Sequence, residues 1–378
     1  MQAPLGSPPE AEKIDLVFCH LLNDASGSPR VLRGTIKALT DAPGRAMLFV
    51  GSQGRGVLES CGIPISRYWY HRSRFRVVTL CTLLLSQICL LFALLRQRHI
   101  AKDAVIYVNT LLPFGGALYG KLTGRKVIYH VHEISIEPKP LRLFLCAIAR
   151  WCSAYNIYVS KSHAEALPIA GVPVVQIYNA LDEDFTAIAA QASYRPRQDG
   201  IFTVLMLASL RDYKGVPEMV ALAAALATRE DVRFELVVND DQAAIDAYFA
   251  GKTLTSNLRL HPRTDNPAMY YQRASLLLNL SRIDSWIETF GLTVLEGMAF
   301  GIPVIVPPIG GPAELVNDGQ QGFLLDSRDA ALLKQRTLAL ADDAALCMSM
   351  SEAARRRAQQ FSKEKFSQAL RELLEKLK

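Results

Sequence analysis

The sequence predicts an α/β fold made of two Rossmann-like domains, each a doubly wound parallel sheet, facing each other across a cleft. Strand-like apolar runs alternate with longer helix-like segments from end to end, which is the pattern of parallel sheets. The 378 residues are enough for two domains that each bury a core. The alternation breaks once, near residues 180–200, and then starts again.

The first half of the chain has the pattern of one domain. Its opening, MQAPLGSPPEAEK, lacks an apolar core, so we expect residues 1–13 to be a flexible tail and not a signal peptide. The N-terminal domain then covers 14–185, and a charged stretch with Pro196 makes 186–200 an interdomain linker. The strand-like runs of this half are 14–20, 46–51, 104–109, 126–132, 156–160 and 172–179.

The second half repeats the alternation and predicts a complete doubly wound sheet over 201–345. From about residue 329 onward, apolar positions recur at three- and four-residue intervals, which predicts helices. We expect the C-terminal helices, 346–378, to pack back towards the N-terminal domain. The strand-like runs of this half are 202–209, 234–240, 258–261, 275–280, 303–308 and 322–326.

Charge is distributed unevenly along the chain. Residues 1–190 carry 20 Lys and Arg against 13 Asp and Glu, whereas the remainder carries 22 against 23. The positive first half suits an anionic partner, such as a membrane surface or a phospholipid-linked acceptor. We do not expect a nucleic acid as partner, because the basic residues are scattered and lack a recognisable reading module.

The cysteines favour a reducing compartment. There are seven, an odd number, with no C-x-x-C pair and no Cys/His cluster at zinc spacing. Together with the absence of a signal-peptide pattern, this predicts a cytoplasmic protein. The basic first domain further suggests peripheral contact with the cytoplasmic face of the inner membrane.

The run 77–95 contains 19 residues without a charge and is flanked by arginines on both sides. Its length alone permits a membrane span. Two other interpretations place it in the first domain, as a core helix that covers the sheet or as a helix whose outer face also touches lipid while the arginines meet phosphates. A true span is the least favoured, since it would separate the two halves of one domain.

The most informative segment contains two carboxylates eight residues apart, Glu288 and Glu296, the second on an expected helix over 291–300. Eight residues of helix rise roughly 12 Å, which is comparable to the distance from the sugar to the ribose of a nucleotide-sugar. Free amides at the helix start suit a diphosphate or a sugar hydroxyl. Either acid alone is explained by the helix dipole. The other donor-binding residues predicted here are Thr289, Phe290, Gly291 and Leu292.

This segment resembles the family 4 glycosyltransferases, retaining enzymes of the GT-B fold, of the type that builds bacterial cell-surface polysaccharides. The resemblance rests on the E-x7-E pair, on Gly-x-Pro-Val at 301–304 and on Gly-Gly-x-x-Glu at 310–314, in this order and spacing. It extends over nearly the whole chain. It implies that Glu288, as a catalytic residue, contacts the donor sugar and that Glu296 contacts the nucleotide ribose.

The turn after the run 202–209 resembles the family's G-R-L-x-x-x-K-G. Lys214 matches the family's Lys, whereas Ser209 occupies the Arg position and Arg211 follows two residues later as its replacement. The resemblance implies that Arg211 and Lys214 neutralise the donor diphosphate. Fixed cations at this place lower the barrier, because departure of the leaving group adds negative charge to the diphosphate.

Two segments of the first half also resemble the family's site. His130-Val-His132-Glu133 follows a strand, and the resemblance places His132 near the reacting carbon as a catalytic residue. The side chain of His130 should point to the opposite face of the sheet. The turn that contains Gly27 and Ser28 looks like the family's Gly-rich loop near the donor phosphate, with one Gly in place of the usual pair.

The expected activity is transfer of a hexosyl or related sugar from a nucleoside-diphosphate sugar to an acceptor hydroxyl, with retention. No cofactor and no metal are expected, because cationic side chains serve the diphosphate and no D-x-D stands where a metal-dependent transferase needs it. The expected acceptor is a glycan or lipid-linked glycan, such as a lipopolysaccharide precursor. A sugar-nucleotide epimerase and a non-catalytic nucleotide-sugar-binding protein stay open, and Trp286 either stacks on a sugar or fills the core.

Overall fold

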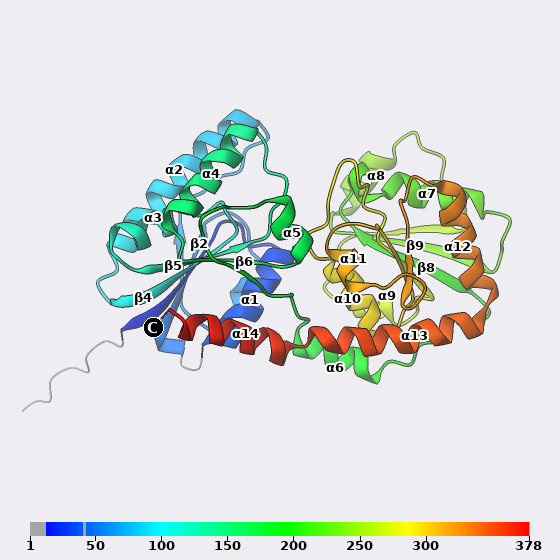
Figure 1. Ribbon diagram of the computed structural model, residues 1–378. Coiled ribbons are helices and arrows are strands. Elements are labelled where there is room, and N and C mark those ends of the chain that lie inside the picture. Colours follow the sequence, from blue (N-terminus) through cyan, green and yellow to red (C-terminus); the bar gives the residue numbers. More distant parts are fainter. Residues whose placement is uncertain (1–12, 41–42, 378) are drawn as a thin grey trace, which may run out of the picture. The chain divides into compact units, whose positions relative to one another are not determined.

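The chain folds into two compact units, each on its own sheet (Figure 1). The computed structural model describes residues 13–40 and 43–377, so the expected tail lies outside the described residues except for Lys13. The first unit comprises the chain up to Tyr158 together with 167–177 and 367–378, and the second comprises 159–166 and 178–366.

The sheet of the first unit has seven parallel strands in the order β3-β2-β1-β4-β5-β6-β7. Its central strands are continuous apolar runs because helices cover both faces of a parallel sheet, and Val17, Phe18 and Cys19 are fully buried. The order reverses between β1 and β4. The strands are β1 Ile14–His20, β2 Ala46–Gly51, β3 Ile65–Tyr68, β4 Ile100–Asn109, β5 Lys126–Val131, β6 Tyr155–Tyr158 and β7 Val174–Gln176.

Helices connect the strands of the first unit. The expected helix at 77–95 is present as α2, and its two ends connect to β3 and β4 of one sheet. The first strand of this pair, β3, was not expected, because the short run Ile-Ser-Arg-Tyr lacks an apolar pattern; it lies at the sheet edge and pairs only with β2. The helices are α1 Gly27–Leu39, α2 Arg76–Leu95, α3 Phe114–Leu122 and α4 Lys139–Cys152.

The sheet of the second unit has six parallel strands in the order β10-β9-β8-β11-β12-β13, with the reversal between β8 and β11. The expectation of two doubly wound parallel sheets is therefore confirmed. The strands are β8 Phe202–Ala208, β9 Val232–Val238, β10 Leu258–His261, β11 Leu276–Leu278, β12 Val304–Val306 and β13 Gly322–Leu324. The helices are α5 Lys161–Ala166, α6 Glu183–Gln191, α7 Val216–Ala225, α8 Gln242–Phe249, α9 Ala268–Tyr271, α10 Leu292–Ala299, α11 Gly311–Leu315, α12 Ala330–Asp342 and α13 Ala344–Ala358. Helix α14, Lys363–Glu375, begins in this unit and belongs to the first unit from residue 367 onward.

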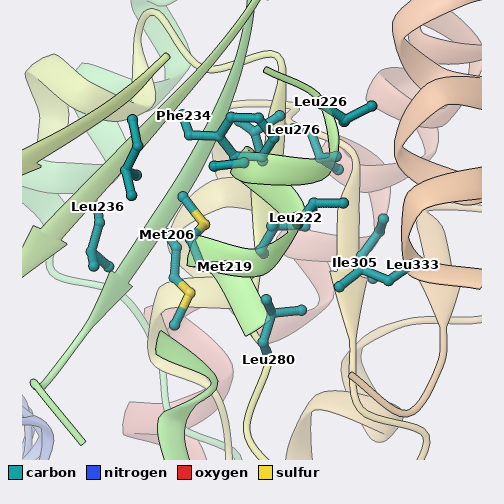
Figure 2. Packing of buried hydrophobic residues seen from close by; sticks show 14 of the residues in the cluster. Met206, Met219, Leu222, Leu226, Phe234, Leu236, Leu276, Leu280, Ile305 and Leu333 are labelled. Atoms are coloured by element: carbon teal, nitrogen blue, oxygen red, sulfur yellow. The ribbon is translucent and has the colours of Figure 1, made fainter. Parts of the chain in front are cut away.

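The core of the second unit lies on both faces of its sheet. Successive strand residues point to opposite faces, so Met206 packs in the cluster drawn in Figure 2 while Leu205 packs in the other. In Figure 2, α7 contributes Met219 and Leu222, and α12 contributes Leu333. The opposite cluster takes its helix residues mainly from α9 and α10.

The division into units differs from the expected boundaries. Residues 186–200 are not a linker: α6 belongs to the second unit, where the Phe185 ring packs edge-on against Tyr271 and Phe300 at 5.8 and 5.4 Å. The expected C-terminal segment 346–378 is also divided. Its part up to residue 366 belongs to the second unit, and only 367–378 joins the first, where Arg371 Nε donates to the carbonyl of Ala38.

Candidate functional site

The reversal of strand order in the second sheet brings two loops to one place. One follows β8 and the other follows β11, and the connections run in opposite directions from the sheet at this point. Open parallel sheets bind ligands beyond the carboxyl ends of their strands at such a reversal. Most of the expected donor-binding residues of the second unit lie on these two loops.

An ion pair joins the two loops. Lys214 Nζ lies 2.6 Å from Glu288 Oε2, although the residues are 74 positions apart, and Ser281 Oγ donates to the same carboxylate oxygen at 3.5 Å. The two side chains are 18 % and 21 % exposed, so they are accessible to a small ligand but shielded from bulk water. The structure therefore brings together Lys214 and Glu288, two of the residues expected in the site.

Glycine positions the backbone on both sides of this pair. Gly215 has φ +82°, and a Cβ there would come within 2.2 Å of the Leu280 carbonyl oxygen. The Gly311 amide donates to the Glu288 carbonyl at 2.8 Å, and a Cβ on Gly310, whose φ is +83°, would come within 2.7 Å of that carbonyl oxygen. A side chain at Gly215 or Gly310 would force these loops apart.

Trp286 belongs to the same arrangement. Its ring stacks on Tyr213, with ring centroids 5.0 Å apart and an interplanar angle of 23°. Lys214 Nζ lies over the indole face, 4.8 Å from the ring centroid. A cation over an aromatic face is attracted by the ring quadrupole, so Trp286 and Glu288 together orient the ammonium group. The sequence left the role of Trp286 undecided, and the structure gives it this contact.

Arg211 does not share this arrangement. It is exposed, and its Nη1 donates to the carbonyl of the preceding residue, Leu210, at 3.0 Å. Lys214 follows on a single 3₁₀ turn, Asp212–Lys214. Arg211 lies near the end of β8. The residue that forms the ion pair with Glu288 is Lys214.

Helix α10 follows Glu288 and carries Glu296. Gly291, with φ +94°, is its N-cap residue and has no side chain that could cap the helix. The first backbone amides of the helix, which begin at Leu292, therefore have no side-chain cap. Phe290 is 2 % exposed and packs in the core, which leaves only its backbone for a ligand. The carbonyl of Thr289 accepts a hydrogen bond from Ser160 Oγ at 2.6 Å.

Glu296 lies deeper than Glu288. Its side chain is 6 % exposed, and its Oε2 accepts a hydrogen bond from the Tyr271 hydroxyl at 2.6 Å. Tyr271 in turn stacks on Phe300. The two acids of the E-x7-E pair thus have different surroundings: a cation holds Glu288, and a buried phenol holds Glu296.

A third acid of the second unit, Glu314, is engaged in structure. Its carboxylate accepts hydrogen bonds from the Ser162 amide and hydroxyl, from the Lys161 amide and from the Tyr178 hydroxyl, at 2.7 to 3.1 Å. Burial alone would raise its pKa, but these four donors outweigh burial and lower the pKa of Glu314 below its ordinary value. Glu314 therefore anchors the start of α5 to the second unit.

The first sheet also gathers polar residues at its reversal point. Asn109, at the end of β4, is fully buried; its Nδ2 donates to the Ser28 carbonyl at 3.2 Å and lies 3.1 Å from His20 Nδ1, at the end of β1. A carbonyl can only accept, so the amide nitrogen must face Ser28 and the amide oxygen must face the other way. The Asn109 side chain thus joins β1, α1 and β4.

The amide oxygen of Asn109 meets His132. The distance from His132 Nε2 to Asn109 Oδ1 is 2.9 Å, and because this oxygen only accepts, Nε2 must carry a proton. The ring of His132 also lies 4.2 Å from that of His130, which pairs through Nδ1 with the Tyr107 hydroxyl at 2.8 Å. The expectation that His130 points to the opposite face is therefore wrong, because residues two apart at a strand end share a face. The structure therefore connects His132 to Ser28 through Asn109.

Burial disfavours charge on two groups of this cluster. Burial lowers the pKa of His20, which favours its neutral form. Burial also raises the pKa of Glu133, although the amides of Leu111 and His132 donate to its carboxylate. The first unit presents hydrogen-bonding groups at its reversal point, with His132 half-buried at the edge of the cluster.

The expected loop in the first unit is a helix start. Gly27 is exposed and opens α1, and the residue before it, Ser26, receives no hydrogen bond at its side chain as a cap but donates its amide to Asp24 Oδ1 at 2.8 Å. Ser28 joins the buried cluster through its carbonyl. Within the described residues, no group of three or more His, Cys, Asp and Glu side chains is arranged to hold a metal ion.

Three contributors were not expected from the sequence: Asn109, Tyr271 and the anchoring role of Glu314. Asn109 had a recognisable signal, because it is a polar residue that ends an apolar strand next to the reversal of strand order. Tyr271 and Glu314 had none, since their partners lie at positions 296 and 161–178 and are brought close only by folding.

The second unit matches a known family. Residues 193–357 match the model described as "Glycosyl transferases group 1". N-acetyl-alpha-D-glucosaminyl L-malate synthase from Bacillus anthracis is 26% identical over 220 residues, which cover 55% of this chain and 54% of that protein. D-inositol 3-phosphate glycosyltransferase from Salinispora arenicola is 37% identical over 112 residues, 29% of this chain and 24% of that protein. The chain thus spans about half, or less, of the length of these relatives, and the matches support a glycosyltransferase of group 1.

Solved structures match the whole chain in fold. HepE from Anabaena, solved in complex with UDP and glucose, is 20% identical with a TM-score of 0.77, covering 96% of this chain and 99% of that chain. Sucrose-phosphate synthase from Thermosynechococcus elongatus is 17% identical with a TM-score of 0.73, covering 97% and 99%. Both units therefore have the fold of these proteins, and the expected GT-B class of two Rossmann-like domains is confirmed.

Proposed function

We propose that this chain, whose second unit matches the group 1 glycosyl transferases, moves a sugar from a nucleoside-diphosphate sugar to an acceptor hydroxyl. The observation that carries the proposal is the pair of Lys214 and Glu288, 2.6 Å apart at the reversal point of the second sheet. A cation and a carboxylate side by side suit a donor that is anionic at its diphosphate and rich in hydroxyls at its sugar.

In this proposal the donor separates the two partners. Lys214 Nζ turns from Glu288 to the diphosphate, and Glu288 accepts hydrogen bonds from the sugar hydroxyls in place of the ammonium group. Exchange of one charge-assisted contact for another keeps both side chains paired throughout. Glu296 binds the ribose, and the backbone amides of 290–292 face the phosphates or a sugar hydroxyl.

The proposed reaction is a substitution at the anomeric carbon. The bond from C1 to the diphosphate oxygen breaks, and its electron pair leaves with the nucleoside diphosphate. The acceptor oxygen forms the new bond to C1, and its proton passes to the leaving diphosphate. Lys214 stabilises the charge that develops on this leaving group, and Arg211 contributes if its exposed guanidinium turns towards the phosphates.

We further propose that the reaction retains the anomeric configuration and needs no metal ion. Attack from the face that the diphosphate leaves accounts for retention without a covalent intermediate. The side chain of His132 contacts the sugar, and the turn at Gly27 and Ser28 approaches the phosphates. The acceptor is a lipid-linked glycan or lipopolysaccharide precursor at the cytoplasmic face of the inner membrane, in keeping with the basic first half of the chain.

A nucleotide end in the donor has support beyond the ion pair. The structure of the similar HepE was solved with UDP and glucose, and a second was solved with UDP-glucose. At about one-fifth identity this likeness shows the fold alone, so the base and the sugar of the donor are left to experiment.

Release of nucleoside diphosphate from a panel of sugar nucleotides tests the proposal. Slow hydrolysis of one donor is expected without acceptor, with loss of this activity in Glu288→Gln and Lys214→Met. Glu352→Gln is the matched control, because that side chain is 70 % exposed on α13. Chelation by EDTA should leave the rate unchanged, and NMR of the product anomer should report retention.

The same assay separates the two alternatives. Conversion of the donor to its epimer, without release of diphosphate, would identify a sugar-nucleotide epimerase. Tight binding of one donor with no conversion, even when lipid-linked acceptors are supplied, would identify a nucleotide-sugar-binding protein. In that case His132→Ala would leave donor binding unchanged.

A further inference from the structure

Helix α2 of the first unit exposes a row of apolar side chains, and its buried face combines two polar residues with Leu83, Leu90 and Leu94. Ser86 and Gln87 are buried, and Gln87 Oε1 accepts a hydrogen bond from the Gly115 amide at 3.1 Å. The outward positions are Val77, Leu84, Leu85, Ile88, Phe92 and Leu95, all of them exposed. A helix on the surface of a soluble protein instead turns a polar face towards water.

Exposed apolar side chains are concentrated in the first unit. Of the eighteen large hydrophobic side chains that are exposed in the described part of the chain, fourteen lie in the first unit and four in the second. Single exposed hydrophobic residues are normal, whereas a contiguous set marks a contact surface. The outward face of α2 is therefore a local feature of this unit and not a general property of the chain.

Helix α4, in the same group of helices, also exposes apolar side chains. Figure 1 shows α2, α3 and α4 side by side; α3 contacts α2 at Gly115 and contacts α4 through the rings of Phe114 and Phe144, 5.3 Å apart. On α4, Leu143 and Trp151 are exposed. We name the outward residues of α2 together with these two residues of α4 the α2–α4 face.

Cationic side chains border the α2–α4 face. Between Glu59 and Asp103 the chain contains seven Arg and Lys residues and no acid. Arg72, Arg74 and Arg76 stand at the start of α2, and the guanidinium of Arg74 lies 4.7 Å from the ring centroid of Phe75. At the far end stand Arg96 and Arg98, both exposed. An apolar strip between two cationic ends is complementary to acyl chains beneath an anionic headgroup layer.

The fold determines how this helix meets a membrane. By length and apolar composition, α2 is the one helix among the described residues that qualifies as a span. However, β3 before it and β4 after it belong to one sheet, so its two ends lie on the same side of a bilayer. Its inward face is also bonded to α3 through Gln87 and Gly115. The helix therefore lies in the plane of the interface.

A second copy of the chain is a poorer occupant. A twofold interface on this face would bring the same surface of each copy together, and the arginines at the ends of one α2 would meet those of the other. Without an acid between Glu59 and Asp103, nothing within that segment offsets the repulsion. An anionic surface meets no such cost.

We propose that the α2–α4 face docks the first unit on the surface of an anionic lipid bilayer, with α2 parallel to the membrane and its outward leucine, isoleucine and phenylalanine side chains among the acyl chains. The proposal does not depend on the transfer reaction, because the docking residues and the ion pair of the second unit are different groups. It specifies the peripheral contact that the charge of the first half suggests.

Vesicle co-sedimentation of the full chain, without donor or acceptor, tests the docking. We expect binding to vesicles of phosphatidylcholine mixed with phosphatidylglycerol, and much weaker binding to phosphatidylcholine alone. The double variant Ile88→Glu/Phe92→Glu should lose at least about tenfold in partitioning, because two charges replace apolar groups at the interface. Both side chains are more than half exposed, so the substitutions leave the core intact. The matched control is Met348→Glu, an exposed apolar residue on α13 of the second unit.

A second set of variants tests how much the cationic side chains contribute to vesicle binding. Arg74→Ser and Arg76→Ser should each weaken binding to the anionic vesicles about fivefold, since a cation near an anionic leaflet contributes about 1 kcal/mol, and high salt should reproduce the loss. Three outcomes overturn the proposal: no binding to anionic vesicles, equal binding by wild type and Ile88→Glu/Phe92→Glu, or a dimer in light scattering that this double variant converts to monomer.

Discussion

The two units share one topology but differ in the side chains at their reversal points. In the first unit, His20, Asn109 and His132 form a hydrogen-bonded cluster in which burial lowers the pKa of His20. In the second, Lys214 and Glu288 form an ion pair that is about one-fifth exposed. The same sheet geometry thus positions an imidazole in one unit and opposite charges in the other.

This difference indicates a division of labour. An ion pair at a partly exposed site is ready to exchange its partner for a charged ligand, whereas a buried hydrogen-bonded network holds one geometry. The second unit is therefore suited to the diphosphate end of a donor. The first unit is suited to orient a half-buried imidazole whose Nε2 is already engaged.

The largest effect should come from breaking the ion pair. Lys214→Met should lower kcat of donor turnover about 10³-fold, or about 4 kcal/mol, because a fixed cation at the leaving group acts mainly in the transition state. Glu288→Gln should cost a similar factor, and the double variant should lose less than the sum, because the two residues contact each other. Steady-state diphosphate release measures all three.

The control for this prediction is stability. Glu352→Gln on the exposed face of α13 should keep wild-type turnover and unfolding. A loss of less than tenfold in kcat for Lys214→Met, together with a lower Tm, would mean that the ion pair serves the fold. The contrast between the units would then disappear.

The next largest effect concerns an acid of the second unit that serves structure. Glu314→Gln should lower the free energy of unfolding by about 3 kcal/mol at neutral pH, because it removes the charge from an acceptor of four hydrogen bonds. The folded pKa of Glu314 lies below its ordinary value of 4.5. Its contribution is therefore full above that ordinary value and is lost as pH falls through the lower, folded pKa.

Urea unfolding at two pH values measures this contribution. The difference between wild type and Glu314→Gln should be largest near pH 7 and should shrink steadily below about pH 4. A difference that stays constant with pH would show that the carboxylate is not ionised in the folded chain. Glu352→Gln again provides the background, since its partner Arg356 is also exposed.

A smaller effect is expected in the first unit, from Asn109. Asn109→Leu keeps the volume but removes the partners of His132 and Ser28, which should lower kcat about ten- to hundredfold with little change in donor KM. Asn109→Asp restores an acceptor for His132 but adds a charge, which raises the pKa of a neighbouring histidine. The acid limb of its pH–rate profile should therefore move to higher pH.

Asn109 acts through His132, so the profile distinguishes positioning from a purely structural role. A structural role would lower activity in proportion to folded protein and leave the shape of the pH profile unchanged. Circular dichroism on both variants provides the folded fraction. An unchanged pH–rate profile in Asn109→Asp would show that Asn109 has no role in positioning His132 for catalysis.

Most of the fold could be predicted because buried parallel strands have continuous apolar sequences. Twelve such runs were expected, and each coincides with a strand. The edge strand β3 could not be predicted from an apolar run, because its four residues include Ser66 and Arg67. The sequence predicts a linker at 186–200, where part of α6 forms, because the acidic start and short length of this helix carry little periodicity. Its place is fixed by the ring of Phe185 against Tyr271 and Phe300.

The site was less accessible to sequence reasoning. The E-x7-E spacing identified Glu288 and Glu296 as a pair, but no local pattern says that Lys214, 74 residues before Glu288, contacts it. The reversal of strand order supplies that information, and it exists only after the sheet has formed. Asn109 has a local signal, as a polar residue that ends an apolar strand, but its partners His20, Ser28 and His132 are brought close only by folding.

The smallest predicted effect decides what Trp286 does. The indole presents its face to Lys214 and stacks on Tyr213, so Trp286→Leu should remove a cation–π contact of about 1 kcal/mol and raise the donor KM about fivefold, with kcat nearly unchanged. The KM of Trp286→Phe should lie between those of wild type and Trp286→Leu, because a smaller ring keeps part of the attraction.

If the indole instead stacks on the sugar, the loss of affinity should vary with the sugar of the donor and be absent for the free nucleoside diphosphate. Calorimetric titration of the sugar nucleotide and of the diphosphate therefore separates the two roles: an equal loss for both ligands assigns Trp286 to the orientation of Lys214, and hence to the charged site of the second unit.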